Sequence, residues 1–195
     1  MSKILLINTG KTQYVEGTLN WMTDGSNMFY QCYNLTSFNS DLSSLTNGNY
    51  MFGSCYNLTT FSSDLSSLTN GTSMFNGCSC LTSFNCNDLS SLATGSNMFS
   101  GCSALTSFNS DLSSLTTGTS MFGSSSYNCT ALNLTSIENI SETINDLDAQ
   151  GKRGTIHIGI SKNLKSDDVT APINVALAAI RAKGWTVNEL YSSKL

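Results

Sequence analysis

Seven cysteines are the residues of this 195-residue chain that most readily suggest chemistry, because thiolates bind metals, form disulfides and act as nucleophiles. Four of them recur at one position of a repeated pattern, namely Cys32, Cys55, Cys78 and Cys102. Stacked copies of the pattern would set these side chains in parallel, at the ~4.8 Å spacing of neighbouring strands. Parallel side chains and an odd cysteine count favour free thiols in the core over a disulfide or a metal site. Cys80 and Cys86 lie outside this column and are the expected reactive thiols.

Aspartates recur in the same pattern, at Asp41, Asp64, Asp88 and Asp111, with Asp24 nearby. A row of carboxylates could bind a cation or a basic ligand. One carboxylate per repeat does not supply the roughly six to eight oxygens that Ca²⁺ prefers. We therefore favour the alternative, in which each aspartate accepts a backbone N–H in an Asx turn at a corner.

His157 is the only histidine, and no other titratable residue stands beside it to complete a catalytic pair or a ligand set. The chain also lacks a G-x-S-x-G nucleophile elbow and a glycine-rich phosphate loop. We expect His157 to lie on the off-face of a strand, exposed or bonded to a neighbour. We expect no enzymatic activity, cofactor or metal.

Four tyrosines gather in the first two full repeats: Tyr30, Tyr33, Tyr50 and Tyr56. Tyr33 and Tyr56 occupy the same repeat position, so they should stack. Exposed tyrosine offers a large contact area at a small entropic cost. This tyrosine cluster is therefore the candidate binding site for a glycan or a protein, and the alternative is that the rings only decorate the surface.

Solvent-facing Thr/Ser pairs are almost identical from repeat to repeat, beginning at Thr36, Thr59, Thr82 and Thr106. A specific binding surface needs variation between repeats. The regular Thr/Ser ladder therefore suits either no ligand or a periodic one, such as an ice surface.

A period of 23 or 24 residues underlies all of these columns, as shown by Met-Phe pairs that begin at Met28, Met51, Met74, Met98 and Met121. The one extra residue lies between Cys86 and Asp88, where a turn should absorb it. The apolar positions are too irregular for a long helix. Such self-similarity predicts a solenoid, in which each repeat forms one coil, or rung, and neighbouring rungs share a continuous core.

The frame L-x-x-F-x-x-D-L-x-x-L-x-x-G-x-x-M-F-x-x-C resembles the bacterial BspA-like leucine-rich repeats over roughly residues 12–132. Gly48, Phe52 and Cys55 match the family's positions, whereas Met51 and Asp41 stand where alanine and proline are usual. The resemblance implies an α/β repeat solenoid, a right-handed leucine-rich-repeat-like coil of about five rungs of 23 residues. Family members are often surface proteins that bind host or matrix proteins, so it also implies recognition or a structural role.

The solenoid is expected to span residues 1–134, with a degenerate first repeat at 12–34. Counting back one period aligns Val15 with Phe38 and Leu19 with Leu42. Trp21 and Tyr14 are extra aromatics that could cover the open end of the core, since terminal repeats are atypical. The apolar run at residues 4–7 should form an edge strand or pair with the first coil.

Residues 135–195 are expected to form a C-terminal helix-strand-helix-strand cap. Apolar residues at helical spacing from Ile137 to Leu147 predict the first helix, with Thr135 or Ser136 as its N-cap and Gly151 as its stop. A strand should follow at 154–160, then a helix at 172–183 and a short strand at 185–187.

Charge is scarce and segregated: charged residues make up 11% of the chain, and seven of the nine Lys and Arg residues fall within 135–195. The run at 4–7 is too short for a signal peptide or a membrane span, so we expect neither. We expect no nucleic-acid partner. The sequence thus indicates a non-enzymatic recognition or adhesion module of a bacterial or bacteriophage surface, whose partner is a protein or glycan. The alternative is a structural spacer or virion decoration protein without a ligand of its own.

Overall fold

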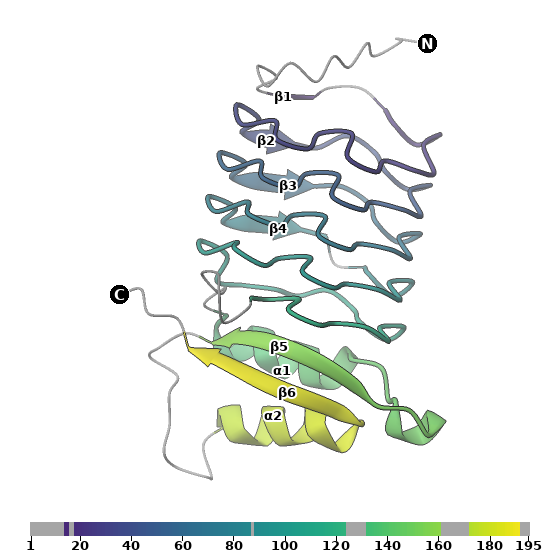
Figure 1. Cartoon of the computed structure of the whole chain (residues 1–195), viewed down its shortest axis with the longest axis vertical. Coiled ribbons are helices and arrows are strands. Elements are labelled where there is room, and N and C mark those ends of the chain that lie inside the picture. Colours follow the sequence, from purple (N-terminus) through teal and green to yellow (C-terminus); the bar gives the residue numbers. More distant parts are fainter. Residues whose placement is uncertain (1–13, 16–17, 87, 124–131, 161–171, 192–195) are drawn as a thin grey trace.

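The computed structural model describes residues 14–15, 18–86, 88–123, 132–160 and 172–191. Up to residue 123 the described chain runs through stacked coils, and four of them contribute one short strand each to a parallel sheet (Figure 1). The strands are β1 (Tyr14–Val15), β2 (Ser37–Phe38), β3 (Thr60–Ser62) and β4 (Ser83–Asn85), paired in that order. Val15 pairs with Phe38, and Phe38 with Phe61. The predicted alignment of the first repeat is therefore confirmed, and the fold is a repeat solenoid.

A second ladder of hydrogen bonds joins the rungs on the opposite side, along the Met-Phe segments. The Phe29 N–H donates to the Met51 carbonyl at 2.8 Å, and the Phe52 N–H donates to the Met74 carbonyl at 2.8 Å. On the strand side the direction is reversed, since the Thr59 N–H donates back to the Thr36 carbonyl. Each rung is thus bonded to both neighbours on both sides.

The Met-Phe segments are chains of tight turns. The Met51 N–H bonds to the Gly48 carbonyl, and the Gly53 N–H bonds to the Tyr50 carbonyl. The residue before each Met has left-handed backbone, with φ between 54° and 58°, at Asn27, Tyr50, Ser73, Asn97 and Ser120. This conformation costs most residues roughly 1–2 kcal/mol, and asparagine tolerates it best. The stacking of neighbouring rungs must offset that cost where tyrosine or serine stands.

Two columns of phenylalanine rings form the core. One column stacks with ring centroids 5.2–5.6 Å apart and interplanar angles of 2–9°, through Phe29, Phe52, Phe75, Phe99 and Phe122. It meets the column of Phe38 and Phe61 edge to face. Each Met packs against a glycine of the preceding rung, so that a Cβ on Gly25 would come within 2.8 Å of the Met51 sulfur. The core is therefore continuous from rung to rung, as predicted.

The rungs keep their register on both sides of the single-residue insertion, whose extra residue, Asn87, lies outside the described residues. Phe84 keeps its register with Phe61 before the insertion, and Asp88 bridges to Asp111 after it. Cys86 takes the place that Ser40 and Ser110 hold in other rungs, and all three are buried. The extra residue changes neither ladder on its two sides.

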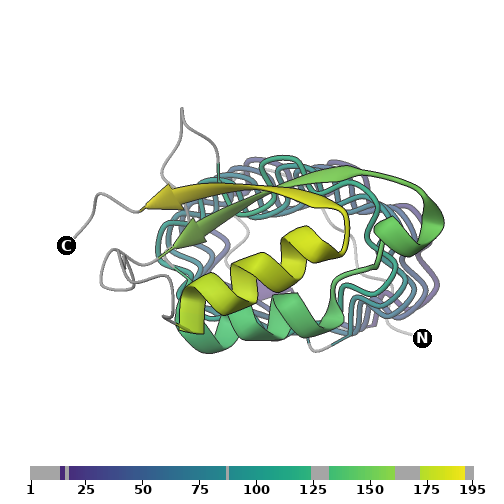
Figure 2. The ribbon, with the colours of Figure 1, turned by 90° about the horizontal axis from the view of Figure 1, so that it is seen from below.

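The C-terminal part contains α1 (Leu134–Thr143), the short 3-10 helix η1 (Asp148–Gln150), β5 (Gly154–Ile160), α2 (Pro172–Ala182) and β6 (Trp185–Tyr191). Its helices and strands follow in the predicted order. β5 and β6 are parallel, with Ile156 beside Val187. The two helices and two strands lie across one end of the stack (Figures 1 and 2).

Three boundaries differ from the sequence prediction. The N-cap of α1 is Asn133, whose side chain accepts the Ser136 N–H at 2.9 Å, so the predicted caps Thr135 and Ser136 were wrong. The helix ends at Thr143, which leaves Leu147 outside it. β6 continues to Tyr191, well past the predicted end at residue 187.

Both sides of the last rung are joined to this C-terminal part. On the strand side, the Phe108 N–H donates to the Ser136 hydroxyl of α1 at 2.8 Å. On the Met-Phe side, Gly118 bridges to Ile156 of β5, and the Phe122 N–H donates to the His157 carbonyl at 3.2 Å. α1 and β5 therefore take the two places that a further rung would occupy.

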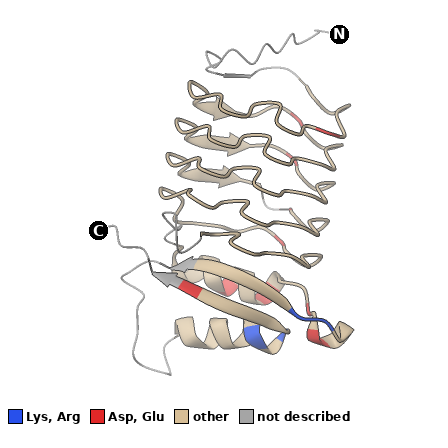
Figure 3. Ribbon diagram, in the orientation of Figure 1, with Lys and Arg blue, Asp and Glu red and all other residues tan. Residues whose placement is uncertain are grey.

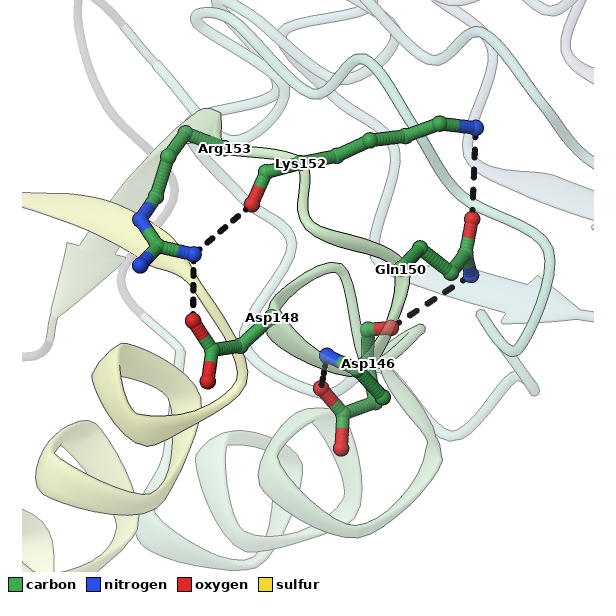
Figure 4. Close-up of polar contacts among 6 residues, drawn as sticks. Asp146, Asp148, Gln150, Lys152 and Arg153 are labelled. Atoms are coloured by element: carbon green, nitrogen blue, oxygen red, sulfur yellow. Dashed lines mark hydrogen bonds and ion pairs between the residues drawn. The ribbon is translucent and has the colours of Figure 1, made fainter.

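Polar contacts hold the turn between α1 and β5 (Figure 4). Asp146 accepts the Ala149 N–H at 2.9 Å, and Arg153 forms an ion pair with Asp148. The Lys152 ammonium donates to the Gln150 side chain at 3.3 Å. Among the described residues, Lys and Arg occur only in this C-terminal part (Figure 3).

The first repeat departs from expectation at Trp21, whose side chain is 70% exposed. Trp21 therefore does not cover the core, which was the predicted role. Leu19 and Met22, on either side, are buried. The strand expected at residues 4–7 lies outside the described residues.

Candidate functional site

The four candidate tyrosines form two ring pairs. Tyr33 and Tyr56 stack with centroids 5.3 Å apart and an interplanar angle of 10°, and Tyr30 meets Tyr50 edge to face at 5.9 Å. Tyr33, Tyr50 and Tyr56 are 41%, 39% and 47% exposed, and Tyr30 is half-buried. Tyr30 covers Gly53, where an added Cβ would lie 2.9 Å from the Tyr30 ring. The tyrosines are thus held by one another while ring surface stays open to solvent.

A groove of about 390 Å³ adjoins Tyr56 and was not foreseen from the sequence. Its lining includes Ser54, Asn76, Gly77 and Ser79 beside the Tyr56 ring. A signal for it was present, because the column that holds Tyr33 and Tyr56 continues with the much smaller Ser79. Because the Tyr56 ring is followed in its column by the small Ser79, an open space remains between these two rungs.

The threonine hydroxyls of the Thr/Ser ladder are used within the solenoid. The Thr59 hydroxyl donates to the Thr36 carbonyl at 2.9 Å, and the Thr82 hydroxyl donates to the Thr59 carbonyl at 3.1 Å. Another column behaves alike, since the Thr69 hydroxyl donates to the Thr46 carbonyl. Their regularity thus has a structural cause, which is the bonding of each rung to the one before it.

The aspartate column forms Asx turns, as predicted. The Asp41 carboxylate accepts the Ser43 N–H at 2.9 Å, and the same bond recurs at Asp64, Asp88 and Asp111. The hydrogen bonds from Ser90 lower the pKa of Asp88. Asp24 belongs to a different column, in which it accepts a hydrogen bond from the Asn47 amide at 3.2 Å. These contacts account for each carboxylate without a bound cation.

The column cysteines are buried free thiols. The Cys55 thiol donates to the Phe29 carbonyl at 3.0 Å, and Cys78 and Cys102 repeat the contact one rung further on each time. Burial raises the pKa of Cys55 to about 12 and also raises the pKa values of Cys78 and Cys102. These thiols are therefore protonated and unreactive at neutral pH.

The two off-column cysteines differ from each other. Cys80 is exposed, but Cys86 is buried, and burial raises its pKa to about 11. The prediction that Cys86 is a reactive thiol was wrong, because Cys86 takes the buried corner position that Ser40 and Ser110 hold in other rungs. Within the described residues, no group of three or more His, Cys, Asp or Glu side chains could hold a metal ion.

His157 has polar neighbours on both ring nitrogens. Nδ1 accepts the Ser120 N–H at 2.8 Å, and Nε2 lies 3.0 Å from the Asn188 amide nitrogen. Burial lowers the pKa of His157, so the ring is neutral, as an Nδ1 acceptor must be. The residue links the last rung to β6, which fits the expectation of a histidine bonded to its neighbours.

Stacked rungs joined by a sheet of short parallel strands, together with a leucine- and phenylalanine-lined core, are typical of a leucine-rich-repeat protein. A family model described as the BspA type leucine rich repeat region matches residues 22–148 in six copies. The match covers more than half of the chain, so the chain belongs to this family, whose repeats generally mediate protein interactions without catalysis. Searches among curated proteins and among solved structures gave no match. None of the helices in the described part of the chain is long and apolar enough to span a membrane.

Proposed function

We propose that this chain is a recognition or adhesion module of a bacterial or bacteriophage surface, and that it binds a protein or glycan through the tyrosine cluster. The observation that carries the proposal is the exposure of three tyrosine rings in a surface made mostly of Ser, Thr and Asn. Large apolar residues are seldom left open to water in such numbers without a partner.

The ring pairing supports a binding role further. Tyr33 and Tyr56 are held parallel by stacking, and Tyr30 is seated over Gly53. Side chains that are already ordered lose little entropy when a ligand binds. Tyrosine is also enriched among the residues that contribute most to binding energy.

The test is the double variant Tyr33→Ser with Tyr56→Ser, screened beside the wild type against an array of glycans and matrix proteins. Serine is compatible with the fold because Ser79 occupies the same column two rungs below Tyr33. We expect binding to be lost while the melting temperature changes little, since exposed substitutions usually alter stability by under ~0.5 kcal/mol.

The matched control is Thr36→Ser with Thr59→Ser, which keeps the hydroxyl donors of the ladder. This control should bind as the wild type does. If it abolishes binding while the tyrosine variant binds normally, a periodic ligand on the Thr/Ser ladder is the better explanation.

A second candidate function is that of a structural spacer or virion decoration protein with no ligand of its own. The observation that favours it is the engagement of the ladder hydroxyls by carbonyls of the preceding rung. A wild-type chain that binds nothing on the array would support this role.

We also propose that the chain consists of two structural parts. Residues 1–134 form a right-handed solenoid of about five rungs, of which 12–34 is the degenerate first, and residues 135–195 form its cap. The bonds from the last rung to Ser136 and His157 support this division, because they end both ladders.

A further inference from the structure

We propose that the groove beside Tyr56 is a subsite for an uncharged sugar ring of a glycan, an inference that rests on the proposed binding role of the tyrosine cluster. The proposal selects one of the two ligand classes, glycan and protein. It also assigns side chains, absent from the sequence-based site, that would contact the sugar.

One face of the Tyr56 ring is already occupied, and the groove lies beside the ring. Tyr33 stacks at an interplanar angle of 10°. The next member of the column is Ser79, whose hydroxyl lies 3.5 Å from the Tyr56 carbonyl and leaves space where a third ring would lie. A Cβ at Gly77 would stand 3.6 Å from the Tyr56 ring, so a side chain at this position would occupy part of the groove and glycine leaves that space open. A flat ligand ring can therefore continue the stack.

The polar groups around this space suit a ring bordered by hydroxyls. Asn76 and Ser54 both line the groove, and within the described part of the chain neither side chain takes part in a hydrogen bond. The amide of Asn76 offers donors and an acceptor, and a serine hydroxyl offers both. A pyranose ring has C–H groups on its faces and hydroxyls around its edge, so it can stack on tyrosine and bond to these side chains at once.

The absence of charge around the groove and its small volume favour a neutral sugar ring over a charged sugar or a protein. None of the groove-lining residues is charged, and the chain has no Lys or Arg between residues 12 and 150. A sulfated or sialylated sugar would find no cationic partner there. The volume of about 390 Å³ lies at the small end of the ~300–1,000 Å³ typical of ligand pockets. A standard protein partner would instead cover about 800 Å² of surface.

The experiment is a printed array that carries neutral cello- and chito-oligosaccharides, sulfated and sialylated glycans, and fibronectin and collagen spots. The wild type is compared with Asn76→Ala, which removes the amide, and with Ser79→Tyr, which fills the groove by extending the tyrosine stack. Asn109→Ala, an exposed asparagine that does not line the groove, is the matched control. Each variant is first checked for an unchanged melting temperature.

We expect the wild type and Asn109→Ala to bind neutral oligosaccharides, and both groove variants to lose about tenfold or more in affinity. Binding to fibronectin or collagen that needs Tyr33 and Tyr56 but not Asn76 would overturn the glycan subsite and leave the proposed function intact. Equal or stronger binding of sulfated or sialylated chains would also overturn it. A wild type that binds no spot would overturn both.

Discussion

At the scale of single residues, the column cysteines act as small apolar groups that carry one donor. Each thiol reaches a phenylalanine carbonyl at 3.0–3.1 Å, one rung back in the stack. Each of these carbonyls also accepts a backbone N–H at 3.0–3.1 Å, from Cys32, Cys55 and Cys78 in turn, so the thiol is its second donor. Cys55, Cys78 and Cys102 therefore contribute both packing and a hydrogen bond at one position of three successive rungs.

Protonation of these thiols makes the stability of the solenoid sensitive to alkali. Burial raises the pKa of Cys55 to about 12 and of Cys86 to about 11, whereas an unfolded thiol titrates near 9. The folded state thus holds these protons longer, so their contribution is complete below pH ~9 and is lost as pH rises. Each such thiol lowers the free energy of unfolding by about 1.4 kcal/mol per pH unit above that point.

Urea melts under reducing conditions, at about pH 7.5, 9 and 10, measure this loss. With Cys55, Cys78, Cys86 and Cys102 contributing, the slope between the two higher values should be about 4 kcal/mol per pH unit, because an unfolded thiol is only half ionised at pH 9. Cys78→Ala should reduce the slope by about a quarter, and Cys80→Ser, at an exposed position, should leave it unchanged. A pH-independent midpoint would show that the thiols are not buried.

Repetition explains which residues could be assigned from the sequence. The Asx turns and the buried cysteine column were predictable because the same residue recurs at the same repeat position in at least four rungs. Cys86 and Trp21 differ from the serines that hold their positions in other rungs, so repetition did not indicate how these side chains would be placed. The groove beside Tyr56 was missed for a related reason, since it arises from a difference between rungs.

At the scale of elements, α1 depends on the residue that begins it. Asn133 accepts hydrogen bonds from both the backbone and the hydroxyl of Ser136, and Ser136 in turn accepts the Phe108 N–H. The N-cap residue Asn133 therefore orients the Ser136 side chain, which is the side chain that bonds to the last rung. Local helix capping and attachment to the solenoid are the same small network.

Asn133→Ala should lower the free energy of unfolding by about 1–2 kcal/mol, the usual cost of losing an N-cap side chain. Thr135→Ala, two residues on at an exposed helix position, should change it by under ~0.5 kcal/mol. Thermal denaturation followed by circular dichroism compares the two. The reverse ranking would restore Thr135 as the cap.

The elements of the C-terminal part were predicted better than their ends. Alternating isoleucines identified β5, and the proline and glycine around α2 marked its limits. The N-cap was misplaced because Asn133, Thr135 and Ser136 are all good caps, and one sequence does not rank them. β6 was predicted too short because Asn188 and Glu189 are unusual in strands. Glu189 is accommodated through its ion pair with Arg181.

At the scale of the whole molecule, the C-terminal part determines whether the apolar last rung is covered by protein or exposed to water. The last rung buries Phe108, Leu112 and Phe122. Removal of residues 135–195 would expose this apolar rung together with two unpaired hydrogen-bond ladders. Solenoids without a polar terminal unit aggregate.

The truncated chain 1–134 should therefore be insoluble, whereas the full chain remains in the supernatant when both are expressed alike. A second form carries the truncation behind a soluble fusion partner, and analytical ultracentrifugation should show it as large assemblies. A truncated chain that is a soluble monomer with unchanged melting would refute the assignment of these residues as a cap.

The stacking of the rungs bears on how the protein responds to force. The rungs follow one another along the long axis (Figure 1), so tension between the first rung and β6 loads the hydrogen bonds between successive rungs in series. Rungs should then peel away one after another rather than all at once. Each rung of 23 residues adds about 75 Å of extended chain in place of ~4.8 Å of stack. A force–extension measurement would resolve these steps. A protein tethered at both ends would lengthen rung by rung under shear.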